Sequence, residues 1–247
     1  MDNEVTEFFD EWKDFSHYSS LNTRPEKFSN WRSDKQLMRE YFGWIEKESN
    51  CPSLKLDLPF PQKEIEVEAL SLMDEFVKHR GDEHPGWHSL VIHGYDKYTT
   101  DDWRSKAYNF TEQPAYTWTD IADVCPVTVN WLKNTWNFKH FDRVRFMLLL
   151  PGGYIKPHVD YEVRKMAAYN IAINNPDGVE FVMEDAGLIP WLPGDARAID
   201  IGRRHSVRHA GTAPRIHMII HGAPGEKHAE VMCRSYDKLL EELNEQQ

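Results

Sequence analysis

A histidine and an aspartate stand two residues apart in the stretch PGGYIKPHVD, which follows a proline-glycine turn. Side chains at positions i and i+2 of a β-strand point to the same face, so a strand here aims His158 and Asp160 into one space. Imidazole and carboxylate both bind transition metals. The pair predicts two thirds of a metal site; the alternative is a surface strand with two outward polar residues.

Candidates for a third ligand follow in the stretch DIGRRHSVRHAGTAPRIHMIIHG, which holds His205, His209, His217 and His221. The segment HSVRH offers two of them four residues apart. In a helix these two would share a face, but the valine between them and the neighbouring turns favour a strand, where they lie about 13 Å apart end to end. Only one of the two can then bind a given metal ion.

An arginine, Arg215, lies ten residues after His205 and opens the segment RIHMIIHG. That segment is otherwise apolar enough for a buried strand, where an unpaired guanidinium would be costly. Two histidines and one carboxylate on one face of an iron are typical of non-haem Fe(II) oxygenases. Their usual co-substrate, 2-oxoglutarate, needs a cation for its distal carboxylate, and the planar fork of arginine suits that role. A surface salt bridge is the alternative for Arg215.

Composition and charge argue against binding of nucleic acid or membranes and against a disulfide-bonded fold. The chain has 247 residues and a net charge of −11, with no lysine-rich block, which disfavours capture of nucleic acid or an anionic membrane. The acidic beginning MDNEVTEFFDEWKDF lacks the basic segment followed by an apolar segment that is typical of a secretion signal. No apolar run is long enough to cross a membrane, so we expect a cytoplasmic protein. Three distant cysteines argue against a disulfide framework and predict buried, reduced thiols.

The second half of the chain has the sequence pattern of a β-sandwich or barrel. From residue 142 onward short apolar segments alternate with Pro-Gly, Asn-Pro-Asp-Gly and Leu-Pro-Gly turns, which predicts a jelly roll. Before it, the sequence predicts a helical buttress with an amphipathic helix between Pro61 and Gly81, whose stripe includes Leu70, Met73 and Phe76, and a helix beginning near Pro126. We expect one domain with a helical and mixed part over 1–141, a jelly-roll core with the metal site over 142–222, and a C-terminal helix over 223–247.

Three pieces of the second half together resemble a known family. They are LLLPGGYIKPHVD, YNIAINNPDGVEFVM and LPGDARAIDIGRRHSVRHAGTAPRIHMIIHG. In order and spacing, residues from about 143 to 222 look like the aspartyl/asparaginyl β-hydroxylase family of Fe(II)- and 2-oxoglutarate-dependent dioxygenases, which also takes in some free-proline hydroxylases. The resemblance implies a mainly β, cupin-like double-stranded β-helix with a helical buttress.

The resemblance also implies roles for individual residues. It makes His158, Asp160 and His205 the iron ligands, Arg215 the partner of the distal carboxylate of 2-oxoglutarate, and Asn170 a polar neighbour of the co-substrate. His209 departs from the family's frequent asparagine; we expect it to support the site, face substrate or lie exposed at the strand end. Met147 stands where some members have a polar residue. The roles of His217 and His221 stay open.

The implied activity is hydroxylation of an Asp- or Asn-type side chain in a peptide or protein, with Fe(II), 2-oxoglutarate and O2. A free amino-acid hydroxylase acting on proline, for example, is one alternative. A cupin-type metal-binding protein without 2-oxoglutarate chemistry is another. We expect an amino-acid or peptide substrate and neither nucleic acid nor membrane as partner, and the loop Gly94–Trp118 to lie over or line the site; a surface excursion is the alternative for this loop. Oligomeric state stays open.

Overall fold

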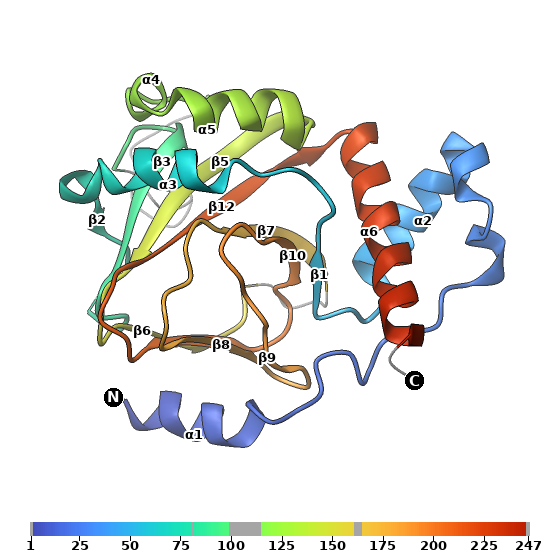
Figure 1. The fold of residues 1–247 in the computed structure, drawn as a ribbon, viewed down its shortest axis with the longest axis horizontal. Helices are drawn as coiled ribbons and strands as arrows, with labels where there is room; N and C mark the ends of the chain where they lie inside the picture. The colour runs from blue at the N-terminus through green and yellow to red at the C-terminus, as the bar shows by residue number, and fades with distance from the viewer. Residues whose placement is uncertain (1, 81, 99–114, 161–164, 246–247) are drawn as a thin grey trace.

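Eight consecutive strands build the central part of the molecule (Figure 1). The computed structural model describes residues 2–80, 82–98, 115–160 and 165–245. Within them the eight strands are β5 (Phe138–Leu149), β6 (Tyr154–His158), β7 (Met166–Ala172), β8 (Val179–Met183), β9 (Gly187–Leu188), β10 (Ala196–Asp200), β11 (His205–His209) and β12 (Arg215–Pro224).

Two antiparallel sheets share these strands. The order β10-β7-β12-β5 forms the middle of the larger sheet, and β6-β11-β8-β9 forms the smaller one. Along the chain, successive strands pass from one sheet to the other, with β8 and β9 as the one hairpin that stays in the same sheet. This is the connectivity of a jelly roll, as the spacing of short strands and turns predicts.

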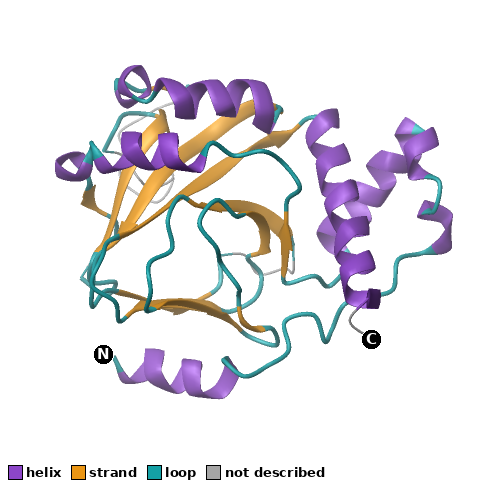
Figure 2. Cartoon of the chain, in the orientation of Figure 1, coloured by secondary structure: helices purple, strands orange, loops and turns teal. Residues whose placement is uncertain are grey.

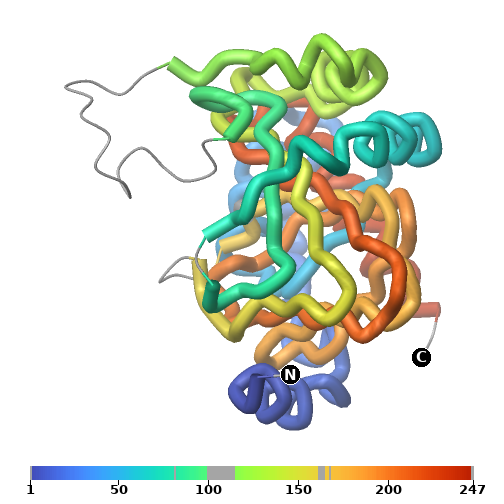
Figure 3. The backbone as a smooth tube through the Cα atoms, turned by 90° about the vertical axis from the view of Figure 1, so that its left-hand side faces the viewer, coloured from blue at the N-terminus to red at the C-terminus, as the bar shows by residue number. Residues whose placement is uncertain are grey.

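Four further strands and the helices complete the fold. The larger sheet is extended by β1 (Ser53–Lys55) at one edge and by β3 (Trp87–Gly94), β2 (Val77–Lys78) and β4 (Thr117–Trp118) at the other. Figure 3 shows β3, β5 and β12 running side by side. The α-helices are α1 (Asn3–Trp12), α2 (Lys35–Lys47), α3 (Gln62–Leu70), α4 (Ile121–Val124), α5 (Pro126–Trp131) and α6 (Glu226–Glu245).

Alternation along each strand divides the apolar side chains between two layers. On β12, Ile216, Met218 and Ile220 join the core between the larger sheet and the helices, whereas Ile219 packs between the two sheets. Figure 2 shows helices covering the outer face of the larger sheet, with α1 alone below the smaller one. Helix α1 packs there through Val5, Phe8 and Phe9.

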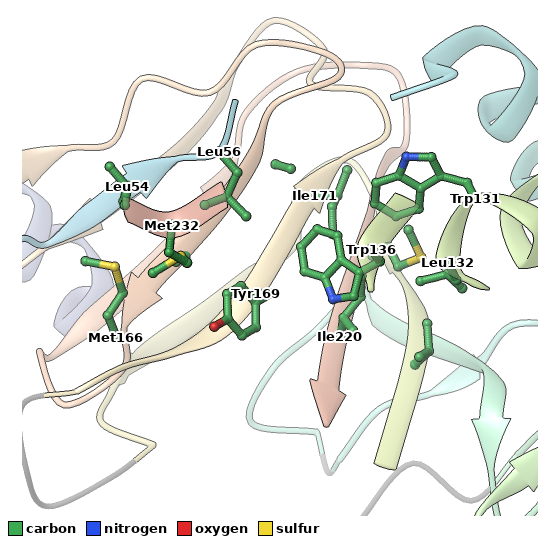
Figure 4. Close-up of a cluster of buried hydrophobic side chains, with 14 of the residues drawn as sticks. Leu54, Leu56, Trp131, Leu132, Trp136, Met166, Tyr169, Ile171, Ile220 and Met232 are labelled. Carbon is green, nitrogen blue, oxygen red and sulfur yellow. The ribbon is translucent and has the colours of Figure 1, made fainter. Parts of the chain in front are cut away.

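The core under the helices is rich in aromatic rings. In Figure 4, Trp131, Leu132 and Trp136 descend from α5 and the π-helical turn that follows it, and meet Ile171 and Tyr169 of β7. The predicted helix start at Pro126 is confirmed. So is the C-terminal helix, whose Met232, Tyr236 and Leu239 are buried. Cys51, Cys125 and Cys233 are free and buried, as expected.

The predicted helix between Pro61 and Gly81 is only partly correct. Helix α3 ends at Leu70, which is 41% exposed, and its buried residues are Ile65 and Ala69. A 3-10 turn over Met73–Glu75 follows, and Val77 already pairs with Ser89 of β3. The apolar spacing continues past Leu70, but pairing with a strand distant in sequence overrides it. Among the described helices, none is both long and apolar enough to cross a membrane.

Candidate metal centre

His158 and His205 face each other across neighbouring strands of the smaller sheet. His158 is the last residue of β6 and His205 the first of β11, and the two are direct partners in the antiparallel register. Their ring centroids lie 4.4 Å apart. Phe181 of β8 stacks on the His205 ring with an interplanar angle of 6°, which holds that imidazole toward the interior.

Asp160 completes the group, but not as strand geometry predicts. Strand β6 ends at His158, so Asp160 lies beyond it, and its backbone N–H donates to the carbonyl of Ile201 at 3.0 Å. Its carboxylate oxygens lie 3.6 Å from Nε2 of His158 and 3.9 Å from Nε2 of His205. One ligand atom from each of the three residues falls within a set whose members are all within 4.8 Å of one another. The convergence is confirmed, although its cause is a bend after the strand.

Both imidazoles are oriented by backbone carbonyls. Nδ1 of His158 lies 2.8 Å from the carbonyl of Lys156, and Nδ1 of His205 lies 2.9 Å from that of Arg203. A carbonyl only accepts, so Nδ1 carries the proton and Nε2 presents its lone pair to the centre of the group. Burial lowers the pKa of His205, so its neutral form is favoured. Neutral imidazole is the form that binds metal.

The turn between β10 and β11 is a support that the sequence patterns missed. Asp200 and Arg203 form a buried ion pair, Nε to Oδ2 3.1 Å, and Asp200 also accepts from the backbone N–H of Gly202. This turn supplies the carbonyl of Ile201 to Asp160 and that of Arg203 to His205. Its only signal in the sequence is the Asp-x-x-Arg spacing, which is too common to assign a role.

Arg215 lies in the interior between the sheets. It begins β12, shares the inward parity of Ile219, and is 2% exposed. Its NH1 donates to Nδ1 of His217 at 3.0 Å, its Nε is buried without a partner, and no acidic residue of the described chain pairs with it. Burial lowers the pKa of Arg215 to about 10, which leaves the guanidinium charged at neutral pH. The predicted burial in a strand is confirmed.

The other residues singled out by sequence are not members of the group of three ligand atoms. Asn170 is half-buried on β7, opposite Ile219, and makes no side-chain hydrogen bond with a described residue. Nε2 of His221 lies 3.4 Å from NH2 of Arg145. Met147 is fully buried between the sheets. Of the loop Gly94–Trp118, residues 99–114 lie outside the described residues.

His209 serves the turn that joins β11 to β12. It is fully buried, Nε2 lies 2.6 Å from the carbonyl of Ala213, and Nδ1 accepts from the N–H of Gly211 at 3.2 Å. The segment HSVRH is a strand, as predicted. The expectation that His209 lies exposed at the strand end is wrong, because both ring nitrogens close the turn.

A family model described as aspartyl/asparaginyl β-hydroxylase matches residues 61–223. The chain belongs to this family. The match begins well before the stretch that carries the resemblance, and so includes α3, β3 and α5. Family membership makes the protein a hydroxylase of the class that uses iron and 2-oxoglutarate, which sets aside a cupin-type protein without that chemistry. No protein of curated description matches the chain by sequence.

Several solved structures resemble the hydroxylase fold at low identity. An oxidoreductase of the 2OG-Fe(II) oxygenase family from Burkholderia pseudomallei is 13% identical, with 76% of this chain and 93% of that chain covered and a TM-score of 0.47. A Pseudomonas putida prolyl-4-hydroxylase is 14% identical, with 74% and 98% covered and a TM-score of 0.43. HygX from Streptomyces hygroscopicus is 9% identical, with 75% and 86% covered and a TM-score of 0.43. The family assignment depends on the sequence match alone.

Proposed function

We propose that this hydroxylase acts on an Asp- or Asn-type side chain in a peptide or protein, with iron held by His158, Asp160 and His205 and 2-oxoglutarate held by Arg215. The observation that carries the proposal is the position of Arg215. A buried guanidinium without an acid partner is costly, so it calls for an anionic ligand in the same interior.

The donor set fits Fe(II). Two imidazoles whose Nε2 atoms face one another's ligand space, and one carboxylate, form the two-histidine, one-carboxylate arrangement, which would leave coordination positions for a chelating co-substrate and O2. Iron, when bound with 2-oxoglutarate and O2, supplies the oxidation of a C–H bond. The protein's part is to bind, orient and exclude water.

The interior between the sheets suits a dicarboxylate. Its apolar members include Met147 and Leu149 of β5, Phe181 of β8 and Ile219 of β12. Arg215 can bind a carboxylate through two parallel hydrogen bonds, and His217 fixes one edge of its guanidinium. Asn170 lies on the neighbouring strand opposite Ile219, and its amide would donate to the same ligand. The apolar walls lower the local dielectric and strengthen each of these bonds.

An anaerobic spectroscopic titration tests this function. Purified protein given Fe(II) and 2-oxoglutarate is expected to develop a visible metal-to-ligand charge-transfer band, because a keto acid chelates the iron. His158→Ala and Asp160→Ala should each abolish or greatly weaken the band. Full retention of the band in both variants would overturn the ligand assignment.

Substrate type is tested separately by substrate-stimulated release of succinate. We expect stimulation by peptides that contain Asp or Asn. Stimulation by free proline alone would instead make the protein a free amino-acid hydroxylase, and stimulation only by a nucleobase, lipid or sugar would exclude both.

A further inference from the structure

The hairpin of β2 and β3 brings a second set of polar side chains to the metal centre. Its two strands pair at Val77–Ser89 and Lys78–His88, and the N–H of His79 donates to the carbonyl of Trp87. The described part of the intervening turn, 80 and 82–86, holds Arg80 and His84. Neither residue belongs to a motif that the sequence patterns single out.

This turn is docked on β6, the strand that ends at His158. The N–H of Tyr154 donates to the carbonyl of Pro85 at 3.1 Å, and the N–H of Lys156 donates to Nδ1 of His84 at 3.1 Å. Glycine permits the close approach, since a Cβ on Gly153 would lie 2.8 Å from the carbonyl oxygen of Pro85. The hairpin is therefore fixed against the metal-binding strand.

His84 presents a donor beside the candidate iron ligands. It is buried, and its ring lies 6.1 Å from that of His158 and 5.4 Å from that of Trp87. Because Nδ1 accepts from a backbone N–H, the proton of the neutral ring is on Nε2. The Nε2–H of His84 is therefore a hydrogen-bond donor fixed by the bond from Lys156.

Arg80 adds a positive charge to the same group. Its guanidinium lies 5.6 Å from the centre of the Trp87 ring, and its φ is +61°, a left-handed conformation that is uncommon for a residue other than glycine. Residues held in this region often cluster at functional sites. Among the described acids of the turn, Asp82 pairs with Lys78, and Glu83 forms no ion pair with Arg80.

We propose that Arg80 and His84 bind a carboxylate of the amino-acid or peptide substrate beside the metal centre. Trp87 holds the guanidinium in place, Arg80 supplies charge, and His84 supplies an N–H. The distal carboxylate of 2-oxoglutarate already has Arg215, so a second cation on the turn that places His84 beside His158 serves a second anion. This inference rests on the proposed function and adds the chemical class of the group that is recognised.

The test uses pairs of compounds that differ only in that charge. The panel holds the twenty free amino acids and tripeptides of the form Gly-X-Gly, each as the free carboxylate and as the C-terminal amide. Succinate release is measured with wild type, Arg80→Asn and Arg80→Lys. Asparagine tolerates a positive φ and removes the charge, whereas lysine keeps the charge.

We expect wild type to prefer a carboxylate over its amide. Loss of a charge-assisted hydrogen bond predicts that Arg80→Asn raises the half-saturating concentration of the carboxylate by about 10- to 100-fold and leaves that of the amide unchanged. Arg80→Lys should fall between the two. Arg32→Asn is the control: Arg32 also lies over a tryptophan, Trp31, at 4.6 Å, but on the helical side of the molecule, where it pairs with Asp237. An effect of lowered stability alone would therefore appear in this variant too.

The charge-transfer band separates failure of this proposal from failure of the proposed function. Arg80→Asn should retain the full band with Fe(II) and 2-oxoglutarate. An unchanged carboxylate preference in Arg80→Asn would overturn the proposal, and so would a wild type that shows the band but is stimulated by no carboxylate of the panel. A wild type without the band would instead contradict the proposed function.

Discussion

His158 and His205 are direct partners in the register of β6 and β11, with their ring centroids 4.4 Å apart. The pairing fixes both imidazoles by backbone hydrogen bonds between strands, so their separation does not depend on a flexible loop. Asp160 joins them through its N–H bond to Ile201. A candidate metal site built in this way is preorganised by the smaller sheet.

The first prediction separates His205 from His209 by metal affinity. His205→Ala removes a candidate ligand, so iron affinity should fall by more than the roughly 10- to 100-fold that loss of a supporting hydrogen bond costs. His209→Ala breaks two bonds of the turn after β11 and should lower the free energy of unfolding, while iron affinity stays within a few-fold of wild type. Calorimetric titration with an inert divalent ion measures the metal affinity of the two variants. If His209→Ala lost more metal affinity than His205→Ala, the two assignments would be exchanged.

Local patterns of the sequence predict those parts of the fold that neighbours in sequence determine. Strand β11 has the predicted bounds, and Arg215 is buried at the start of β12 because RIHMIIHG reads as an interior strand. The three candidate ligands also meet as expected. The strand bounds and the burial of Arg215 follow from residue type and spacing, whereas the choice of His205 as the third ligand comes from the family resemblance.

Long-range contacts determine what those patterns do not predict. The apolar spacing after Leu70 favours more helix, yet Val77 pairs with β3. Asp160 reaches the site through a bend and a bond to Ile201, which strand alternation cannot reveal. His84 comes beside His158 because the β2–β3 turn docks on β6.

The second prediction concerns Asp237, a buried carboxylate that ties the N-terminal helices to α6. It accepts from NH1 of Arg24 at 2.5 Å, Nε1 of Trp31 at 2.9 Å and the hydroxyl of Tyr41 at 3.0 Å. Asp237→Asn should lower the free energy of unfolding by about 3 kcal/mol, because buried donors lose a charged acceptor. Urea unfolding measures the change. Asp10→Asn, which removes an exposed ion pair with Lys13, is the control and should unfold like wild type.

The third prediction is a pH dependence of stability that arises from His228. Its ring is enclosed by Trp136, Phe138 and Tyr169, and burial lowers its pKa to about 4. The unfolded chain binds this proton near pH 6.5 and the folded chain does not, so stability is lost as the pH falls below 6.5. Between pH 7.5 and 5.5 this one group should cost about 1.4 kcal/mol.

His228→Phe keeps a ring in that enclosure and removes the proton site. Urea unfolding at pH 7.5 and 5.5 should show a loss of stability on acidification that is smaller than that of wild type by about the same 1.4 kcal/mol. An equal loss in both proteins would mean that His228 is protonated in the folded state. The other buried histidines, such as His79, continue to contribute in both proteins.

The last prediction concerns the bond between Arg215 and His217. Arg215→Ala should lower the affinity for 2-oxoglutarate by a factor of about 30 or more, because loss of one partner of a buried charge pair costs about 2–5 kcal/mol. The affinity for iron should stay unchanged. Burial lowers the pKa of His217, with the charge of Arg215 as the next cause, so its neutral Nδ1 accepts from the guanidinium. His217→Ala removes that acceptor, and should lower the affinity for 2-oxoglutarate by about 10-fold.

A double-mutant cycle tests whether His217 acts through Arg215. If it does, the double variant Arg215→Ala/His217→Ala should bind 2-oxoglutarate no more weakly than Arg215→Ala alone. Titration of 2-oxoglutarate into the four proteins closes the cycle; additive losses would show that His217 contacts the co-substrate independently, and unchanged affinity in Arg215→Ala would remove Arg215 from the site.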